Sequence, residues 1–146
     1  MIRRISALTY AVVCRGTAGE VRLAPDTYIG YMQAIDGTDE ISVKRKTQLE
    51  RYFQEFCDHV LFFKRLSDLK FKNEGNFRVG KSSQTTVTVW AFKAWKWRLY
   101  GAILSVEGRR TFVGVNIDPD KKQDKADRQM LTSTAQKISE LSEFWA

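Results

Sequence analysis

The chain contains little of several features that define whole classes of protein. Its two cysteines, Cys14 and Cys57, are too few for the disulfide framework of a small secreted domain and lack the paired spacing of a metal site. Two prolines and nine glycines exclude collagen-like and low-complexity chains. No apolar run approaches the roughly 20 residues that cross a bilayer. We therefore expect a soluble protein in a reducing, cytoplasmic compartment.

The first residues partly imitate a signal peptide, which keeps export open as an alternative. Arg3 and Arg4 precede a mostly apolar stretch over residues 5 to 14. Ser6 and Thr9 interrupt that stretch, and its alternation is equally compatible with an edge strand. We expect residues 1–19 to be an amino-terminal extension or an extra strand.

What is present favours one globular domain over residues 1–146. The length is close to the modal domain size, and 43% apolar with 12% aromatic residues is too hydrophobic for intrinsic disorder.

Two helices are predicted in the first half of the chain. Pro25 and Asp26 predict the start of a helix over 25–35. A second helix is predicted from Ser42, and its apolar stripe consists of Leu49, Phe53, Phe56, Val60 and Phe63. The opposite side of this helix, which includes Lys44 and Arg45, is expected to be an ordinary solvated face.

The second half of the chain is predicted to form strands and a closing helix. β-Branched and aromatic residues predict strands over 85–90, 97–104 and 110–117. Asp118-Pro119-Asp120 predicts the start of a last helix, with Trp145 on its apolar stripe as a core residue. The predicted fold class is α+β: an antiparallel sheet of three to five strands, with two N-terminal helices packed on one face and a C-terminal helix.

Positive charge is concentrated in the middle third of the chain. The net charge is +7, and residues 70 to 117 hold nine basic residues against only Glu74 and Glu107. The same third contains Trp95, Trp97 and Tyr100. Cations mixed with flat rings suit phosphate contacts and base stacking. The alternative is that the rings are core residues of a twisted sheet and the cations form a solvated face.

Three stretches resemble the RelE/ParE superfamily of toxins from type II toxin-antitoxin systems, including the phage-derived HigB-like and Gp49-like branch. Residues 21–28 look like that family's first strand running into its first helix, and residues 97–103 like its central strand. Residues 112–117, with Lys121, Lys122 and the following segment, are similar to the family's apolar strand, basic pair and closing helix.

This resemblance implies a RelE-like fold and a set of site residues. Arg98 matches the family's central-strand arginine, Lys93 and Lys96 match the preceding basic positions, and these three are the candidate catalytic residues. The candidate nucleic-acid-binding residues are Lys121, Lys122, Arg109, Arg110, Trp95, Trp97 and Tyr100. The chain departs from the family in having no tyrosine in its closing segment and Asn116 where histidine is common.

These residue types fit metal-independent cleavage of RNA. The guanidinium of Arg98 could bind two oxygens of a pentavalent phosphate, and a lysine with a pKa lowered by neighbouring cations could act as base. For each lysine the alternative is an ordinary surface cation. His59 is expected to be a packing residue, and neither a metal site nor a cofactor is expected.

Three functions are compatible with the sequence. The first is the toxin of a toxin-antitoxin system, a ribosome-dependent endoribonuclease (mRNA interferase) that inhibits translation by cleaving mRNA. The second is a ParE-like toxin that acts on DNA gyrase without nuclease activity, and the third is a nonenzymatic, phage-derived nucleic-acid-binding protein. The toxin hypotheses imply a cognate antitoxin as partner, and the first also implies mRNA and the ribosome. No membrane partner is expected.

Overall fold

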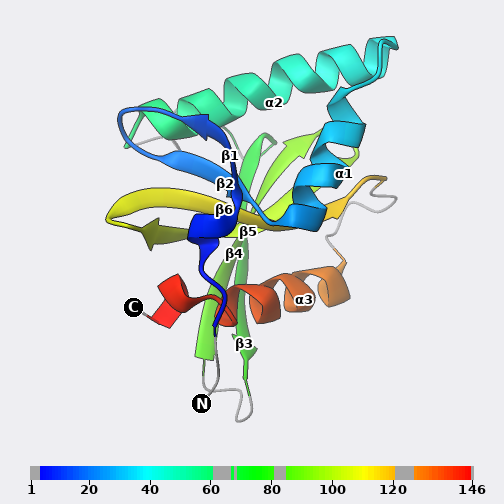
Figure 1. Ribbon diagram of the computed structural model, residues 1–146. Helices are drawn as coiled ribbons and strands as arrows, with labels where there is room; N and C mark the ends of the chain where they lie inside the picture. Colours follow the sequence, from blue (N-terminus) through cyan, green and yellow to red (C-terminus); the bar gives the residue numbers. More distant parts are fainter. Residues whose placement is uncertain (1–3, 61–66, 68, 81–84, 121–126, 146) are drawn as a thin grey trace.

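The centre of the fold is a mixed six-stranded sheet in the computed structural model, which describes residues 4–60, 67, 69–80, 85–120 and 127–145 (Figure 1). The strand order is β1-β2-β6-β5-β4-β3. Strand β2 runs parallel to β6, whereas the other neighbouring pairs are antiparallel. The strands are β1 (Ala11–Arg15), β2 (Glu20–Leu23), β3 (Phe71–Val79), β4 (Thr85–Ala94), β5 (Trp97–Val106) and β6 (Arg109–Asp118).

Helices cover both faces of the sheet. Helices α1 (Pro25–Ile35) and α2 (Glu40–Asp58) lie on one face, and α3 (Arg128–Ser139) lies on the other (Figure 1). Short 3-10 turns, η1 (Ala7–Thr9) and η3 (Ser142–Trp145), lie near the chain ends. Each face has its own hydrophobic core, so the central strands are buried on both sides. None of the described helices combines the length and apolar character needed to span a membrane.

Local sequence signals explain where the helices begin. Pro25 occupies the first turn of α1, where its missing N–H has no partner to lose. Asp39 caps α2 by accepting a hydrogen bond from the Ser42 N–H at 3.1 Å, and Asp127 caps α3 by accepting from the Gln129 N–H at 2.8 Å. Each aspartate satisfies an amide that the helix itself leaves without a partner.

The core beneath α2 is a cluster of phenylalanine rings. Phe92 lies at its centre, with ring centroids 4.9 Å from Phe53, 4.4 Å from Phe71 and 4.8 Å from Phe112. Phe56 closes the cluster from the helix side. Most of these pairs are tilted or edge-to-face, the arrangement that aromatic quadrupoles favour. This cluster therefore fixes α2 to strands β3, β4 and β6.

The α+β class is confirmed, but the predicted sheet is wrong. The sheet predicted as antiparallel with three to five strands is in fact six-stranded and mixed, and α1 and α2 lie between its second and third strands in the chain. The sheet is mixed because β2 pairs in parallel with β6, from Glu20 opposite Thr111 to Leu23 opposite Gly114. Because β2 and β6 are far apart in the sequence, no local residue pattern predicts that they pair.

Several predicted element boundaries also change. Strand β6 extends to Asp118 and α3 begins at Arg128, so no described helix starts at residues 118–120. Trp145, expected in the core, is 49% exposed. Helix α2 ends at Asp58, leaving Val60 exposed, and Phe63 lies outside the described residues. Strand β3 is absent from the prediction because it is a polar edge strand with a bulge between Asn73 and Gly75 that breaks its alternation.

Phe92→Ala should lower the free energy of unfolding by about 3–5 kcal/mol, because it removes a fully buried ring and leaves a cavity between rigid neighbours. Urea denaturation measures the change. The matched control is Arg51→Ala, an exposed position on α2, which should stay within about 0.5 kcal/mol of the wild type. An equal loss in both variants would contradict this account of the core.

Candidate nucleic-acid interface

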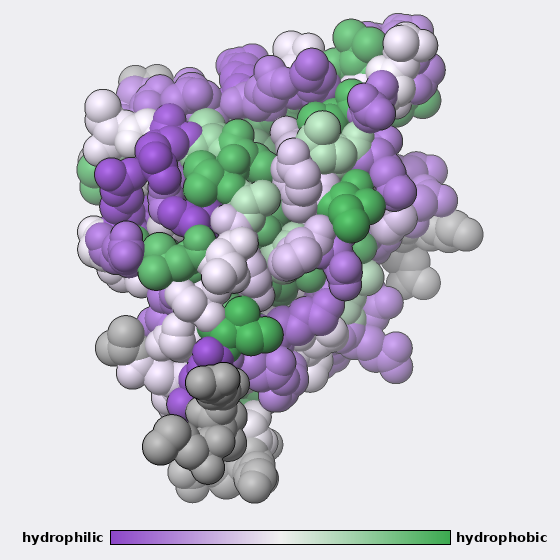
Figure 2. Space-filling view, viewed as in Figure 1, coloured by the Kyte–Doolittle hydropathy of each residue, from purple (hydrophilic) through white to green (hydrophobic). Residues whose placement is uncertain are grey.

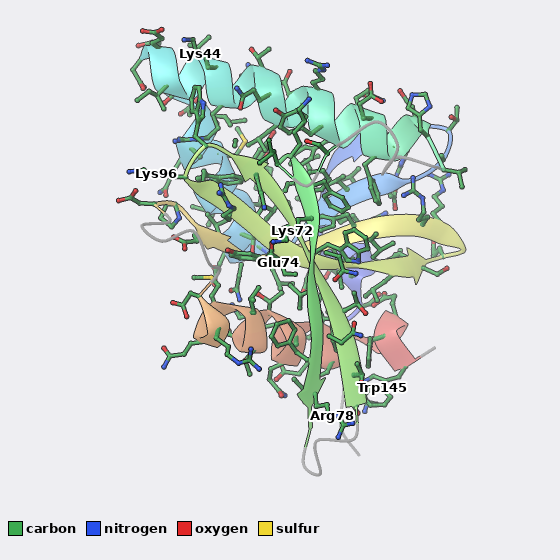
Figure 3. All side chains as sticks on the ribbon, turned by 180° about the vertical axis from the view of Figure 1, so that it is seen from behind. Lys44, Lys72, Glu74, Arg78, Lys96 and Trp145 are labelled. Atoms are coloured by element: carbon green, nitrogen blue, oxygen red, sulfur yellow. The ribbon has the colours of Figure 1, made fainter. Side chains whose placement is uncertain are left out.

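The turn between β4 and β5 borders a groove of about 500 Å³, which we call the turn groove. The start of α2 and the end of β6 form its other sides. Figure 3 shows Lys44 of α2 and Lys96 of the turn at the same end of the molecule. The residues that line the turn groove are Glu40, Ile41, Lys44, Arg45, Trp95, Lys96, Pro119 and Asp120.

Trp95 presents its ring to this groove. It is 48% exposed, and its backbone is left-handed with φ of 54°, an uncommon conformation for a residue other than glycine. Such backbones persist only where the surroundings hold them. Here Arg98 does so, since its Nη1 donates to the carbonyl oxygens of Trp95 and, at 3.0 Å, of Trp97. The exposed ring is thus mounted on a fixed turn.

The charge in the turn groove is mixed but retains available cations. Lys44 is paired with Glu40 at 2.8 Å, and both side chains are exposed. Arg45 donates to the carbonyl of Ala34 at 3.1 Å, a neutral partner that leaves its positive charge in place. Lys96 is exposed at the turn itself. An aromatic ring with adjacent cations can stack a nucleic-acid base and contact the flanking phosphates.

A second group of polar side chains lies on the α3 face of the sheet, and we call it the strand-end cluster: Glu74, Lys93, Arg98, Tyr100 and Asp118. Lys93 is directly opposite Arg98 on the neighbouring strand, and Arg98 is opposite Asp118. Lys93 contacts Glu74 at 3.9 Å, with side chains only 13% and 9% exposed. This cluster is therefore mostly closed to solvent.

Burial perturbs the strand-end cluster. It lowers the pKa of Arg98, although Tyr100, Glu74 and Asp118 act in the opposite direction. Burial, together with Glu74 and Asp118, raises the pKa of Tyr100 to about 12, so its hydroxyl stays protonated at neutral pH. Among the described residues, neither the Tyr100 hydroxyl nor Arg98 Nε has a hydrogen-bond partner. Unsatisfied buried donors are uncommon in native proteins, and each can be satisfied by a water, an ion or a ligand.

The structure brings some predicted site residues together and separates others. Lys93 and Arg98 are neighbours on the α3 face, whereas Lys96 lines the turn groove against α2 on the opposite side. Trp97 and Tyr100 are each 1% exposed, so neither ring offers a face to a ligand. Arg109 and Arg110 begin β6, beside the carboxyl end of β5, and the length of β5, about 30 Å at roughly 3.3 Å per residue, separates them from the turn that holds Trp95.

Other residues fall outside these two groups. Lys121 and Lys122 lie outside the described residues. His59 is at the carboxyl end of α2, with Nε2 3.6 Å from a Glu55 carboxylate oxygen. In the part of the chain that the structure describes, no three His, Cys, Asp or Glu side chains gather as metal ligands would.

Helix α2 contributes to the turn groove in a way that the sequence pattern does not predict. The pattern places Lys44 and Arg45 on an ordinary solvated face, but both line the groove. Ile41, at the start of α2, is exposed and lines the groove as well. Single exposed apolar residues are common on protein surfaces, so no sequence signal marked this end of α2 as a site.

The chain matches no protein-family model, no curated protein and no solved structure. The resemblance to RelE/ParE toxins therefore stays a prediction, and the case for any function of this chain rests on its geometry.

The two cysteine thiols meet between β1 and α2, and they should differ in reactivity. The hydrogen bond from Cys57 lowers the pKa of Cys14, and the same bond, with burial, raises the pKa of Cys57. Because the thiolate is the reactive form, iodoacetamide should modify Cys14 first, with a pH midpoint below the ordinary value for cysteine.

Mass spectrometry of the native protein after alkylation across a pH series measures both rates. Cys57→Ala should move the Cys14 midpoint upward, because the donor is lost. Faster labelling of Cys57, or an unchanged midpoint in Cys57→Ala, would contradict the contact.

Proposed function

We propose that the protein binds single-stranded nucleic acid at the turn groove, in the cytoplasm. The observation that carries the proposal is the half-exposed ring of Trp95, mounted on a fixed turn beside Lys96 and Arg45. A base stacks on the ring and the cations contact the phosphates on either side. Stacking tolerates any base, so binding is expected to show little sequence preference.

The ring must carry most of the affinity, because the groove is not strongly cationic. It holds three basic side chains but also the carboxylates of Glu40 and Asp120. Two phosphate contacts to a single strand give a slope of about −1.4 in a plot of log affinity against log salt. A binding mode based on phosphate neutralisation alone would give a steeper slope.

Trp95→Ala should weaken binding of a fluorescein-labelled oligouridylate by about 5- to 150-fold, since base stacking contributes about 1–3 kcal/mol. Fluorescence anisotropy with the full chain measures the affinity. Trp145→Ala is the matched control, because this ring is 49% exposed but lies far from Lys96 (Figure 3).

The phosphate contact proposed for Lys96 is tested by measuring the affinity for the same oligouridylate at several salt concentrations. Lys96→Ala should reduce the salt slope by about 0.7, and Arg78→Ala, an exposed cation near the far end of β3, should leave it unchanged (Figure 3). Equal losses in Trp95→Ala and Trp145→Ala would place the binding elsewhere.

A ribonuclease toxin is the second candidate, and the strand-end cluster is the observation that favours it. Arg98 and Tyr100 carry buried donors without hydrogen-bond partners in the described chain, next to Lys93 on the same face. Both atoms are buried, so a phosphate accepting from Arg98 Nε and the Tyr100 hydroxyl requires the cluster to open. Because Lys93 is held by Glu74, its use as a base requires that pair to separate.

If this candidate is right, the wild-type chain added to a translating extract should cleave mRNA, and its expression should arrest growth. Arg98→Lys keeps the charge but loses the two-pronged donor, and should slow cleavage by about 10²- to 10³-fold. Primer extension on a reporter message measures the cleavage. Intact messages with a DNA-damage response would indicate the gyrase-directed alternative, and intact messages alone would leave nucleic-acid binding without catalysis.

A further inference from the structure

A second hollow, of about 380 Å³, lies at the opposite end of the sheet from the turn groove. We call it the arginine hollow. It is formed where the β1–β2 loop meets the β5–β6 turn. Its lining residues are Arg15, Gly16, Thr17, Ala18, Gly19, Gly108, Arg109 and Arg110.

The loop that forms one wall is fixed by hydrogen bonds and close packing. The Ala18 N–H donates to the carbonyl of Cys57 at 2.7 Å, and Arg110 Nε donates to the carbonyl of Ala18 at 3.2 Å. Gly19 has no space for a side chain, since a Cβ there would lie 2.5 Å from the Arg110 carbonyl oxygen. The wall is therefore already in place before any ligand arrives.

Charge in the arginine hollow is unbalanced. Glu20 is fully buried and accepts from Arg15 Nε and Arg22 Nε at 2.8 Å each, and Arg109 Nη1 lies 3.7 Å from the same carboxylate. One carboxylate thus faces three guanidinium groups, of which Arg15 and Arg109 line the hollow. Arg110 also lines it, and its guanidinium donates to the carbonyls of Ala18, Phe56 and His59, neutral partners that leave its charge in place. Burial opposes ionisation of Glu20, but the Arg22 and Arg15 hydrogen bonds outweigh it and lower its pKa, so it remains charged.

No acidic side chain is found among the described residues that line the arginine hollow. Besides Glu20, which contacts Arg15 and Arg109, two carboxylates adjoin the lining residues. Asp58 lies under Gly16, where it accepts from Gln54 Nε2 at 2.8 Å, and Glu107 precedes the Gly108 turn. The side chains of Arg15 and Arg109 are 53% and 55% exposed, so positive charge faces solvent. Figure 2 shows strongly hydrophilic surface over this end of the β1–β2 hairpin.

We propose that the arginine hollow binds a phosphate group or diphosphate. A guanidinium fork can donate two hydrogen bonds to one phosphate. A hydrogen bond to Glu20 already orients Arg15, and Arg109 lies within ion-pair distance of the same carboxylate. Side chains that are ordered before binding lose less conformational entropy when the ligand arrives. This site does not depend on the turn groove, and it assigns Arg109 and Arg110 to a location separate from Trp95.

Isothermal titration of the full chain with inorganic pyrophosphate tests the site. The wild type should bind, and Arg109→Gln and Arg15→Gln should each weaken binding by about tenfold or more, because a charge-assisted hydrogen bond is lost. At one fixed concentration, pyrophosphate should raise the melting temperature of the wild type by more than that of Arg109→Gln. Glu20 keeps Arg22 as a partner in both variants, and the melting curves also report whether each variant is folded.

Two controls separate specific binding from general attraction to a basic protein. Arg51→Gln removes an exposed cation on α2 and should bind pyrophosphate like the wild type. Trp95→Ala should also bind it, whether or not the turn groove binds nucleic acid. No binding by the wild type, or equal binding by Arg51→Gln and Arg109→Gln, would overturn the proposal.

A second ligand identifies the source of the phosphate. If the affinity for oligouridylate also falls in Arg109→Gln, the phosphate belongs to a nucleic-acid backbone. If only pyrophosphate and mononucleotide binding fall, the ligand is a free phosphorylated molecule. Both results support the same chemistry in the arginine hollow.

Discussion

A sheet covered by helices on both faces restricts where polar chemistry can lie. The middle residues of β5 and β6 are buried on either side, and a charge there would be desolvated without compensation. Charged side chains on these strands are accordingly found at their ends: Arg98 and Asp118 at one, Arg109 and Arg110 at the other. The turn groove and the arginine hollow are both consequences of this arrangement.

The sequence predicted the local part of this arrangement and not the long-range part. The strand predicted over 97–104 is present as β5, and the period of two along it puts Trp97 and Leu99 on one face and Tyr100 on the other. The same alternation could not show that α3 covers the second face, so Tyr100 was expected at a surface. Burial of that ring depends on α3, an element that begins only at Arg128.

The concentration of charge in the middle third of the chain is real, but its interpretation as one patch does not match the geometry. Because β5 and β6 form a hairpin, Lys96 and Arg109 lie at opposite ends of a ten-residue strand. A count of basic residues over positions 70 to 117 includes both side chains as if they were neighbours. Conversely, Lys44 and Arg15, from the first third of the chain, complete the two hollows. Proximity in sequence is a poor guide when the sheet joins distant strands.

Arg98 illustrates how one side chain can link structure to chemistry. Its Nη1 is engaged with the carbonyls of the turn, which holds Trp95 in its left-handed conformation, while its Nε faces the strand-end cluster without a partner in the described chain. Loss of Arg98 would therefore disturb the turn groove as well as any phosphate contact on the α3 face. For this reason a change in activity on removing Arg98 does not by itself identify a catalytic residue. Only a variant that keeps the turn bonds and the nucleic-acid affinity, and still loses cleavage, separates a chemical role from a positioning one.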